Sequence, residues 1–543
     1  MAEKEITIQI RNIEILALIA IILVVFALEL KLTLSEPIVF GDEGHHARLS
    51  QWIAQEVEYP KYVPFTGSPL AMRGFTRPSL WNLLGASFLF ILGFHQEILK
   101  FLIPFTAVIV TGPAVYVLTK RLYNKEVAFI ATIIALAIPS FVTYSVLYYT
   151  DILLTLYLSM SILTLILAVK TDSRKYWILS GLTCGLAFVT KSAGYAVFFI
   201  AGIFFLYQLY KQRNLFKLLK NYLIWFVFAI LLIVPFFARN YLLFQNLCSD
   251  LPLPYQGPGQ CSTYFTYTSQ YNYTSTAAQV GTEVGILKFG IAEYLNFAYG
   301  NIWFVVFAFF CGLAITLYRR NSIDVLILIS LLPILVIYLR TPDTRVENMS
   351  RYFLGWVPII GIIAGIYFEE VYSFVKKYQK YLALAIFMIA IFFSFQALQD
   401  KLSVMYQVKG QWSQYFWDAC TYIKDKTPQD SRIFTVWAAP TIFNCQRTVG
   451  GGGDDSPDIT LSGNATLALS RLKLHQVNYI FVQKGSISTM SVAETYPWVF
   501  IQMMESNPER FVKVFENGET NLQNCLYSGC DGDIIYQLNY TGL

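Results

Sequence analysis

The sequence predicts a polytopic α-helical membrane domain, residues 1–399, followed by a small α/β domain, residues 400–543. Hydrophobic residues make up 55% of the 543 residues, charged residues only 14%, and the mean hydropathy is +0.49. Such values are typical of a chain that crosses a membrane several times. The aromatic content of 16% suits belts of Tyr and Trp at the membrane interfaces.

Eleven apolar runs are long enough to cross a bilayer. They lie near residues 15–34, 99–119, 127–148, 152–170, 176–190, 194–210, 222–244, 299–318, 323–339, 352–372 and 381–398. The first is too long for a cleavable signal. The run Leu80–Phe94 is shorter, and we predict a juxtamembrane helix there.

The distribution of positive charge predicts the topology. With a cytoplasmic N-terminus, the loops that fall inside are rich in Lys and Arg, whereas the long loop 245–297 holds only Lys288. This asymmetry follows the positive-inside rule. The net charge of +5 is small and lies largely in loops, so membrane lipids are expected partners and nucleic acid is not.

The segment after residue 400 alternates short apolar and helical stretches. We predict helices at Trp412–Lys426 and Ala465–Leu474 and strands at Arg432–Trp437, Asn478–Gln483 and Ile534–Leu538. An odd number of spans places this domain outside. Six cysteines then also lie outside, and the local pairs Cys248–Cys261 and Cys525–Cys530 are the simplest of fifteen possible pairings.

Carboxylates occur at the predicted outer ends of two apolar runs. Asp42 and Glu43 follow the first run in Gly41-Asp42-Glu43-Gly44-His45-His46, and Asp151 opens another in Tyr148-Tyr149-Thr150-Asp151. Carboxylates are costly to place beside a bilayer and usually have a function there, which suggests a membrane enzyme acting on a polar group at the bilayer edge. The alternative interpretation is that Asp42 and Asp151 only cap the helices that follow them.

Several short segments, taken in chain order, resemble a known family. They are Asp42-Glu43 with Ala47-Arg48, Thr76-Arg77-Pro78-Ser79-Leu80-Trp81, Asp151, Gly185-Leu186-Ala187-Phe188-Val189-Thr190-Lys191 and Arg351-Tyr352-Phe353-Leu354. The pattern resembles the C-type glycosyltransferases, in the branch of protein O-mannosyltransferases and lipid A aminoarabinose transferases, over about residues 10–375. Arg77, Ser79 and Ser192 replace the Lys, Pro and Gly that are usual in this branch.

The resemblance implies an inverting transfer of a hexose or pentose from a polyprenyl monophosphate, dolichyl or undecaprenyl, to an acceptor. The acceptor is a protein, glycan or lipid on the outer face of the plasma membrane or its equivalent. Asp42 is the expected base, and Glu43 either supports the site from behind or orients the acceptor. Asp151 holds the acceptor or steadies the positive charge that develops on the sugar. The groups expected on the lipid phosphate are Arg77, Lys191, Arg345, Arg351 and Tyr352.

Each of these assignments has a plainer alternative. The cations could reach ordinary lipid head groups, and Tyr352 could belong to an aromatic belt. His45 and His46 invite a metal site, but adjacent residues on a helix point in different directions, and the resemblance requires no cofactor. The rival function is a transporter or a lipid-linked sugar flippase, for which we would expect internal repeats and charges at mid-span. The tail contains no Trp-Trp-Asp-Tyr-Gly run, which argues against an oligosaccharyltransferase.

Overall fold

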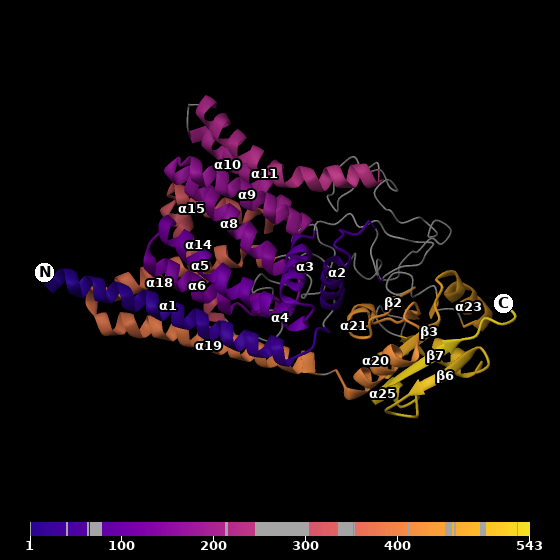
Figure 1. Ribbon diagram of the computed structural model, residues 1–543. Coiled ribbons are helices and arrows are strands. Elements are labelled where there is room, and N and C mark those ends of the chain that lie inside the picture. The colour runs from indigo at the N-terminus through magenta and orange to yellow at the C-terminus, as the bar shows by residue number, and fades with distance from the viewer. Residues whose placement is uncertain are drawn as a thin grey trace.

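The computed structural model describes residues 2–39, 42–61, 65, 79–211, 215–244, 303–334, 351, 353–410, 412–450, 459–460, 463–488, 496–528 and 530–543. Long helices lie side by side and form most of the molecule, and a small domain with a β-sheet lies at one end of them (Figure 1). This arrangement confirms the predicted fold class, a helical membrane domain with a small α/β domain.

The long helices coincide with the predicted apolar runs. They are α1 Ala2–Ser35, α4 Gln96–Pro104 joined through η1 Phe105–Val110 to α5 Thr111–Leu122, α6 Lys125–Ala137, α7 Pro139–Ser145, α8 Thr150–Thr171, α9 Arg174–Thr190, η2 Ser192–Tyr195, α10 Ala196–Lys211, α11 Leu215–Phe244, α14 Trp303–Arg319, α15 Ser322–Ser330, η4 Leu354–Trp356, α18 Val357–Tyr378 and α19 Lys380–Gly410.

Seven described helices are long and apolar enough to span a membrane, or eight if the bent pair α6 and α7 counts as one span. The chain is therefore an integral membrane protein. The predicted runs 176–190, 299–318 and 323–339 fall on helices of 17 residues or fewer within the described part of the chain. The predicted number of eleven spans thus remains a prediction.

The predicted run 127–148 is not one straight helix. It divides at Ile138 into α6 and α7, whose axes differ by 64°. Pro139 has no backbone N–H and restricts the residue before it, and Ile138 has the extended ψ of 124° that this restriction favours. The bend means that the chain leaves α7 at Ser145, before it reaches the start of α8.

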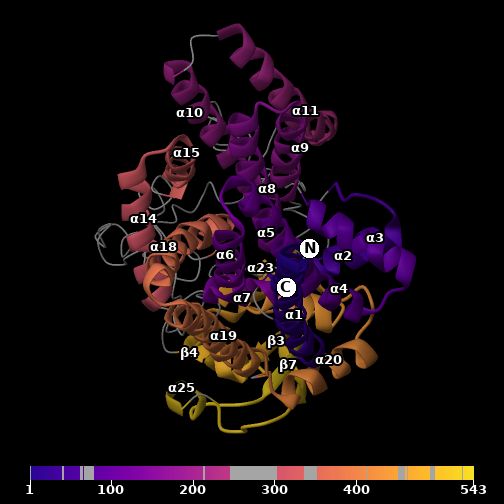
Figure 2. The same ribbon diagram turned by 90° about the vertical axis from the view of Figure 1, so that its left-hand side faces the viewer.

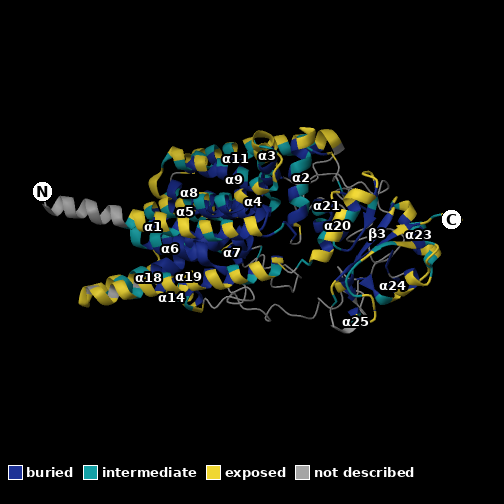
Figure 3. Ribbon diagram, turned by 60° about the horizontal axis from the view of Figure 1, so that its bottom comes forward, coloured by how far each residue is buried: buried dark blue, intermediate teal, exposed yellow. Residues whose placement is uncertain are grey.

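The centre of the helical domain is α8. Of its apolar stretch 83% is buried, against 28% for α1, 29% for α19 and 17% for α11. It packs against α5 and α9, while α10, α11, α14 and α19 lie toward the periphery in the view along the helices (Figure 2). Exposed residues follow the outer sides of α1, α11 and α19 (Figure 3). The helix α8 is therefore enclosed by other parts of the molecule over most of its apolar stretch.

Two shorter helices, α2 Glu43–Glu56 and α3 Leu80–Leu92, lie between the long helices and the sheet domain (Figure 1). The helix α3 is the one predicted as juxtamembrane. Asn82 on α3 donates to the carbonyl oxygen of His46 on α2 at 2.7 Å. A Cβ at Gly85 would lie 1.9 Å from the hydroxyl of Tyr148, so only glycine lets α3 approach this closely.

The small domain is built on a five-stranded sheet in the order β2-β1-β3-β7-β6. The strands are β1 Arg432–Phe434, β2 Thr448–Val449, β3 Tyr479–Gln483, β6 Phe511–Glu516 and β7 Asp533–Leu538, and the helices are α20 Gln414–Lys426, α21 Ala438–Asn444, α23 Ala465–Leu474, α24 Trp498–Glu505 and α25 Cys525–Ser528. The pairs of β1 with β2 and β3 are parallel, whereas β7 is antiparallel to β3 and β6. A separate pair joins β4 Ile487–Ser488 to β5 Tyr496–Pro497.

Several predicted elements of this domain are confirmed, with small shifts at their ends. The helix 465–474 has its predicted bounds, and the strand predicted at 432–437 ends at Phe434. The edge strands β2 and β6 were not predicted. The predicted domain boundary after residue 399 lies inside α19, which continues to Gly410.

Two disulfides hold the small domain. Cys525–Cys530 is the local pair that was predicted, whereas Cys420–Cys445, which joins α20 to the end of α21, was not. The other predicted pair, Cys248–Cys261, lies outside the described residues. Because Cys445 follows α21 directly, the second bond ties α21 to the sheet domain.

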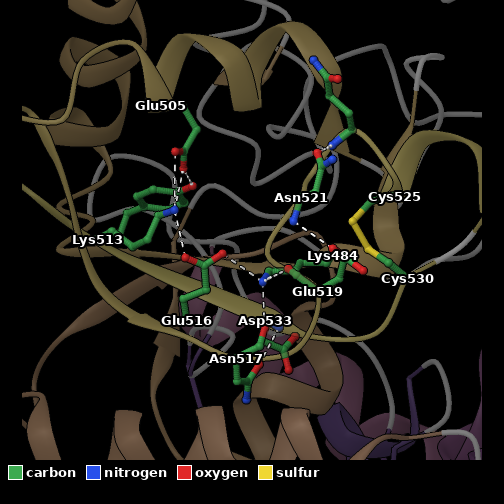
Figure 4. Close-up of polar contacts among 12 residues, drawn as sticks. Lys484, Glu505, Lys513, Glu516, Asn517, Glu519, Asn521, Cys525, Cys530 and Asp533 are labelled. Carbon is green, nitrogen blue, oxygen red and sulfur yellow. Dashed lines mark hydrogen bonds and ion pairs between the residues drawn. A yellow bond between two sulfur atoms is a disulfide. The ribbon is translucent and has the colours of Figure 1, made fainter.

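A buried lysine fixes one turn of the same domain. Lys484 is fully buried, and its ammonium donates to Glu516 Oε1 at 3.0 Å, to the carbonyl oxygen of Asn517 at 2.7 Å and to that of Glu519. Figure 4 shows Asp533 beside this group. Burial raises the pKa of Asp533 to about 7, with Lys484 lowering it and Asp531 raising it further.

Candidate active site

Asp42 lies at the start of α2, in the N-cap position, but its side chain makes no capping hydrogen bond. The side chain is 63% exposed, and Oδ2 lies 3.5 Å from Nη1 of Arg351. The backbone N–H of Asp42 donates to the hydroxyl of Tyr149 at 2.9 Å. The plain helix-cap interpretation of Asp42 therefore does not describe this structure, in which the carboxylate faces a cation and open space.

Asp151 lies in the first turn of α8, and its side chain is only 2% exposed. Its Oδ1 accepts from Nζ of Lys191 at 2.7 Å, and its Oδ2 accepts from Nε of Arg351 at 2.9 Å. Each oxygen thus binds its own cation. Charge-assisted bonds of this length are strong, so Asp151 fixes the positions of both cations.

The two cations come from distant parts of the chain. Lys191 is the C-cap residue that directly follows α9, and Arg351 lies 200 positions after Asp151. The guanidinium of Arg351 also lies 4.5 Å from the centre of the Tyr149 ring, close enough for a cation–π contact. Arg351 therefore bridges Asp42 and Asp151 while it rests on Tyr149.

Four of the predicted site residues are thus brought together. Asp42, Asp151, Lys191 and Arg351 form one connected polar group, which we call the ionic cluster. Three predicted phosphate ligands, Arg77, Arg345 and Tyr352, lie outside the described residues. Their parts in the site remain predictions.

The charges of the cluster determine which groups are ionised. Burial raises the pKa of Asp42, but at the low pH where Asp42 titrates, the positive charges of His46, Arg351 and His45 outweigh this effect, so the pKa lies below its usual value. Burial opposes the charge on Arg351, yet Asp151, Tyr149 and Asp42 outweigh that effect and raise its pKa. Asp42 and Arg351 are therefore both charged at neutral pH.

His46 is a neutral neighbour. Burial, and next the charge of His45, lower its pKa to about 4, although Asp42 opposes the shift. Its Nδ1 lies 3.3 Å from Oδ1 of Asn82, and its ring lies 6.1 Å from that of Tyr149. The rings of His45 and His46 are 6.1 Å apart and differ in orientation by 70°. In the part of the chain that the structure describes, no three His, Cys, Asp or Glu side chains are placed to hold a metal ion.

Glu43 does not share the exposed position of Asp42. Its side chain is fully buried and accepts from the N–H groups of Val39 at 3.2 Å and Tyr148 at 3.0 Å and from Nζ of Lys409 at 3.2 Å. Consecutive helical residues point about 100° apart, which separates Glu43 from its neighbour. In this structure Glu43 joins the start of α2 to α19 and to the connection before α8, which suits the supporting role that was one of its two predicted roles. Its other predicted role, to orient the acceptor, stays a prediction.

Some residues of the site were not predicted. Lys409 follows the last apolar run in a stretch that already holds polar residues, and nothing in the sequence marks it as the partner of Glu43. Tyr149 stands two positions before Asp151 in a motif that was noted only for its carboxylate. The helix α21 also packs against α2. Asn444 of α21 donates to the carbonyl oxygen of Ile38, in the connection before α2, at 3.0 Å. A Cβ at Gly44 would lie 2.3 Å from the carbonyl oxygen of Ala439.

Comparisons with known proteins agree with this architecture. Residues 77–238 match the family model described as dolichyl-phosphate-mannose-protein mannosyltransferase. None of the curated proteins matches the chain.

Solved structures with similar folds cover nearly the whole chain. The oligosaccharyltransferase of Archaeoglobus fulgidus in its apo form is 14% identical with a TM-score of 0.64, over 93% of this chain and 80% of its own. ArnT from Cupriavidus metallidurans bound to undecaprenyl phosphate is 12% identical with a TM-score of 0.62, and the match covers 97% of this chain and 98% of ArnT. The mycobacterial arabinofuranosyltransferase AftD is 14% identical with a TM-score of 0.55, and the match covers 95% of this chain and 40% of AftD.

These findings confirm the resemblance that the sequence motifs indicated. All three structures are glycosyltransferases, and the match to the mannosyltransferase model includes Asp151 and Lys191 of the ionic cluster. The chain therefore has the membrane fold of the C-type glycosyltransferases, and its residues 77–238 carry the pattern of the mannosyltransferase branch.

Proposed function

We propose that the protein transfers a sugar from a polyprenyl monophosphate to an acceptor, with inversion at the anomeric carbon. The observation that carries this proposal is the ionic cluster, in which an exposed carboxylate, Asp42, lies beside Arg351, one of the two cations that Asp151 holds in place. A base next to a phosphate-binding group is the pair that such a reaction requires.

The reaction breaks one bond and forms another. The acceptor oxygen attacks the anomeric carbon and forms a new C–O bond, while the bond from that carbon to the phosphate oxygen breaks and its electrons remain on the phosphate. The acceptor hydroxyl gives its proton to the Asp42 carboxylate. The products are the glycosylated acceptor and free polyprenyl phosphate, and Asp42 later releases the proton to water.

Arg351 and Lys191 are the described groups best placed to receive the phosphate. Each already gives one bond to Asp151, which holds it in position, and each side chain carries further N–H donors. Arg77, Arg345 and Tyr352 remain candidates for the same role. Support comes from ArnT, whose structure was solved with undecaprenyl phosphate. It also comes from AglB, the oligosaccharyltransferase of Archaeoglobus fulgidus, which was solved with a dolichol-phosphate and an inhibitory peptide.

The contact between Arg351 and Asp42 couples the two substrates. The charges of His46, and next of Arg351, keep the pKa of Asp42 low, which makes Asp42 a weak base. A phosphate that binds Arg351 would neutralise part of this charge and raise the pKa of Asp42, so the base becomes effective once the donor is in place. This arrangement predicts that the donor binds before the sugar is transferred to the acceptor.

The acceptor side is proposed to face away from the cytoplasm, at the plasma membrane or its equivalent, as the charges of the loops indicate. The sheet domain, proposed to be extracytoplasmic, contacts α2 through α21 and so lies beside Asp42. Its two disulfides suit an oxidising compartment. We propose that an acceptor, whether protein, glycan or lipid, reaches Asp42 from its exposed side, next to the contact between α2 and this domain.

The test is a transfer assay with purified protein in lipid nanodiscs. A panel of polyprenyl-phosphate hexoses and pentoses is supplied with candidate acceptors, and free polyprenyl phosphate is measured together with the glycosylated product. Wild-type protein should release both in equal amounts with at least one donor, and Asp42→Asn should not. A protein that moves the intact lipid-linked sugar between leaflets without releasing polyprenyl phosphate would be a flippase, and the proposal would be wrong.

A further inference from the structure

We propose that Tyr149 is a positioning residue that sets the spacing between the phosphate-binding cation Arg351 and the base Asp42. This inference rests on the proposed function and adds to it a residue for which no role was expected. Tyr149 touches both partners: its ring lies under the guanidinium of Arg351 at 4.5 Å, and its hydroxyl accepts the backbone N–H of Asp42 at 2.9 Å.

The position of Tyr149 follows from the bend before α8. The connection between Ser145 and Thr150 is irregular, and Tyr149 has an extended backbone with φ −114° and ψ 151°. Neighbouring residues of extended chain point to opposite sides. Tyr148 accordingly packs on α2 and α3, with its hydroxyl 3.0 Å from Oγ of Ser50 and its ring 5.1 Å from Trp81, while Tyr149 points to the ionic cluster.

Tyr149 is well supported for such a role. Only 5% of it is exposed, and the ring of Tyr144 meets it edge-on at 5.7 Å. Burial, and next the negative charge of Asp42, raise its pKa, so the hydroxyl keeps its proton at neutral pH. A rigid neutral ring can therefore hold Arg351 by its face and the Asp42 loop by its oxygen without adding charge to the site.

The two contacts serve different substrates, and this makes the inference testable. The ring supports Arg351, which is proposed to bind the donor phosphate, so losing the ring should weaken donor binding. The hydroxyl holds the backbone of Asp42, which is proposed to accept the proton, so losing the hydroxyl should slow turnover and leave donor binding unchanged. Substitutions of a residue that only stabilised the fold would not change donor binding and turnover separately.

The experiment compares Tyr149→Phe, which keeps the ring, with Tyr149→Leu, which removes it. Tyr148→Phe is the matched control, because it removes a buried tyrosine hydroxyl at the adjacent position that contacts Ser50 and not the ionic cluster. Binding of a polyprenyl monophosphate to each protein in nanodiscs gives a Kd, and steady-state transfer gives kcat and the donor KM.

We expect Tyr149→Phe to lower kcat by roughly 3- to 10-fold, the range of one neutral hydrogen bond, with Kd within about twofold of wild type. Tyr149→Leu should raise Kd by roughly 3- to 30-fold, as expected for a partly buried cation–π contact, and should also lower kcat. Tyr148→Phe should keep both values within about twofold, even if its melting temperature falls.

Three outcomes would overturn the inference. Wild-type values in both Tyr149 variants would mean that the contacts do not matter for transfer. A parallel change of kcat and Kd in Tyr149→Phe would indicate a purely structural role. If wild-type protein transfers no sugar at all, the proposed function fails, and the donor Kd still tests the ring contact. Equal Kd values for Tyr149→Phe and Tyr149→Leu would then overturn the ring contact. Weaker donor binding by Tyr149→Leu alone would support it.

Discussion

Removing the charge of Asp151 should destabilise the protein as well as impair donor use. In Asp151→Asn the side chain keeps its size, but Lys191 and Arg351 no longer face a negative charge between them. One amide oxygen can still accept from one cation, while the amide NH₂ group points toward the other. The ionic cluster changes from two positive and two negative charges to a net charge of +1.

The magnitude follows from the geometry. At 2.7 and 2.9 Å, each ion pair has a Coulomb attraction of about 6 kcal/mol at an effective dielectric constant of about 20. Desolvation of the ions offsets much of this gain, and breaking a buried pair typically costs about 3–5 kcal/mol. Because Lys191 and Arg351 are 26% and 20% exposed, solvent screens them in part, and we expect a loss of about 3 kcal/mol.

The assay is thermal unfolding of the full chain in nanodiscs, with Asp172→Asn as the matched control. Asp172 also pairs with a lysine, Lys217, but both side chains are about half exposed, and such a surface pair contributes about 1 kcal/mol or less. Asp151→Asn should therefore melt clearly lower than the control. The double variant Asp151→Asn with Lys191→Met restores charge balance and should recover part of the stability, while its donor binding stays weak.

The reasoning would be refuted by two results. If Asp151→Asn melts like Asp172→Asn, the ion pairs do not stabilise the fold. If Lys191→Met adds no stability in the Asp151→Asn background, the loss does not come from uncompensated positive charge. Either result would require another explanation for why both oxygens of Asp151 face cations.

Three further predictions test other parts of the molecule. Asp42→Asn should lower kcat by at least about 100-fold with an unchanged melting temperature, and near-normal kcat would remove Asp42 from the role of base. Gly44→Ala places a Cβ 2.3 Å from the carbonyl oxygen of Ala439, so hydrogen exchange in α21 should increase, whereas Gly202→Ala, whose Cβ meets nothing within 4 Å, should leave it unchanged. Asp533 has a raised pKa of about 7 in the folded state, so it lowers stability progressively as pH rises from about 4 to 7, by about 4 kcal/mol at most. Asp533→Asn should remove this loss. If the melting temperature falls as much between pH 5 and pH 8 in Asp533→Asn as in wild type, the prediction is wrong.

Much of the membrane domain could be predicted because hydropathy is a local property. The apolar runs coincide with helices, since about twenty apolar residues in lipid can satisfy their backbone only as a helix. The bend at Ile138 was missed although Pro139 was visible, because a proline inside an apolar run either kinks the helix or is absorbed by it. The strand β6 was missed because it lies at the sheet edge, and its sequence, Phe511-Val512-Lys513-Val514-Phe515-Glu516, mixes polar with apolar residues.

The four residues of the ionic cluster could be predicted individually, but their partners could not. Local motifs marked Asp42, Asp151, Lys191 and Arg351 individually. The pairing of Asp151 with Arg351 spans 200 positions and that of Glu43 with Lys409 spans 366, and no local pattern carries such information. The adjacent acids Asp42 and Glu43 were given different roles, but the sequence did not show that the first is exposed and the second fully buried.

The separation of Asp42 from Glu43 explains how a loop at the membrane edge can hold a base in place. Glu43 faces inward and binds Lys409 near the end of α19, the helix that leads into the sheet domain. Two tyrosines before α8 hold the same pair of acids. The backbone N–H of Tyr148 donates to the Glu43 carboxylate, and the hydroxyl of Tyr149 accepts from the backbone N–H of Asp42. Asp42 is thus tied to α19 and to the start of α8 through backbone and neighbour contacts, and its carboxylate itself remains exposed. The backbone contacts hold the proposed base in place, and Oδ2 meets Arg351 only at 3.5 Å. The carboxylate therefore stays accessible to an acceptor, which is the property that the proposed reaction needs.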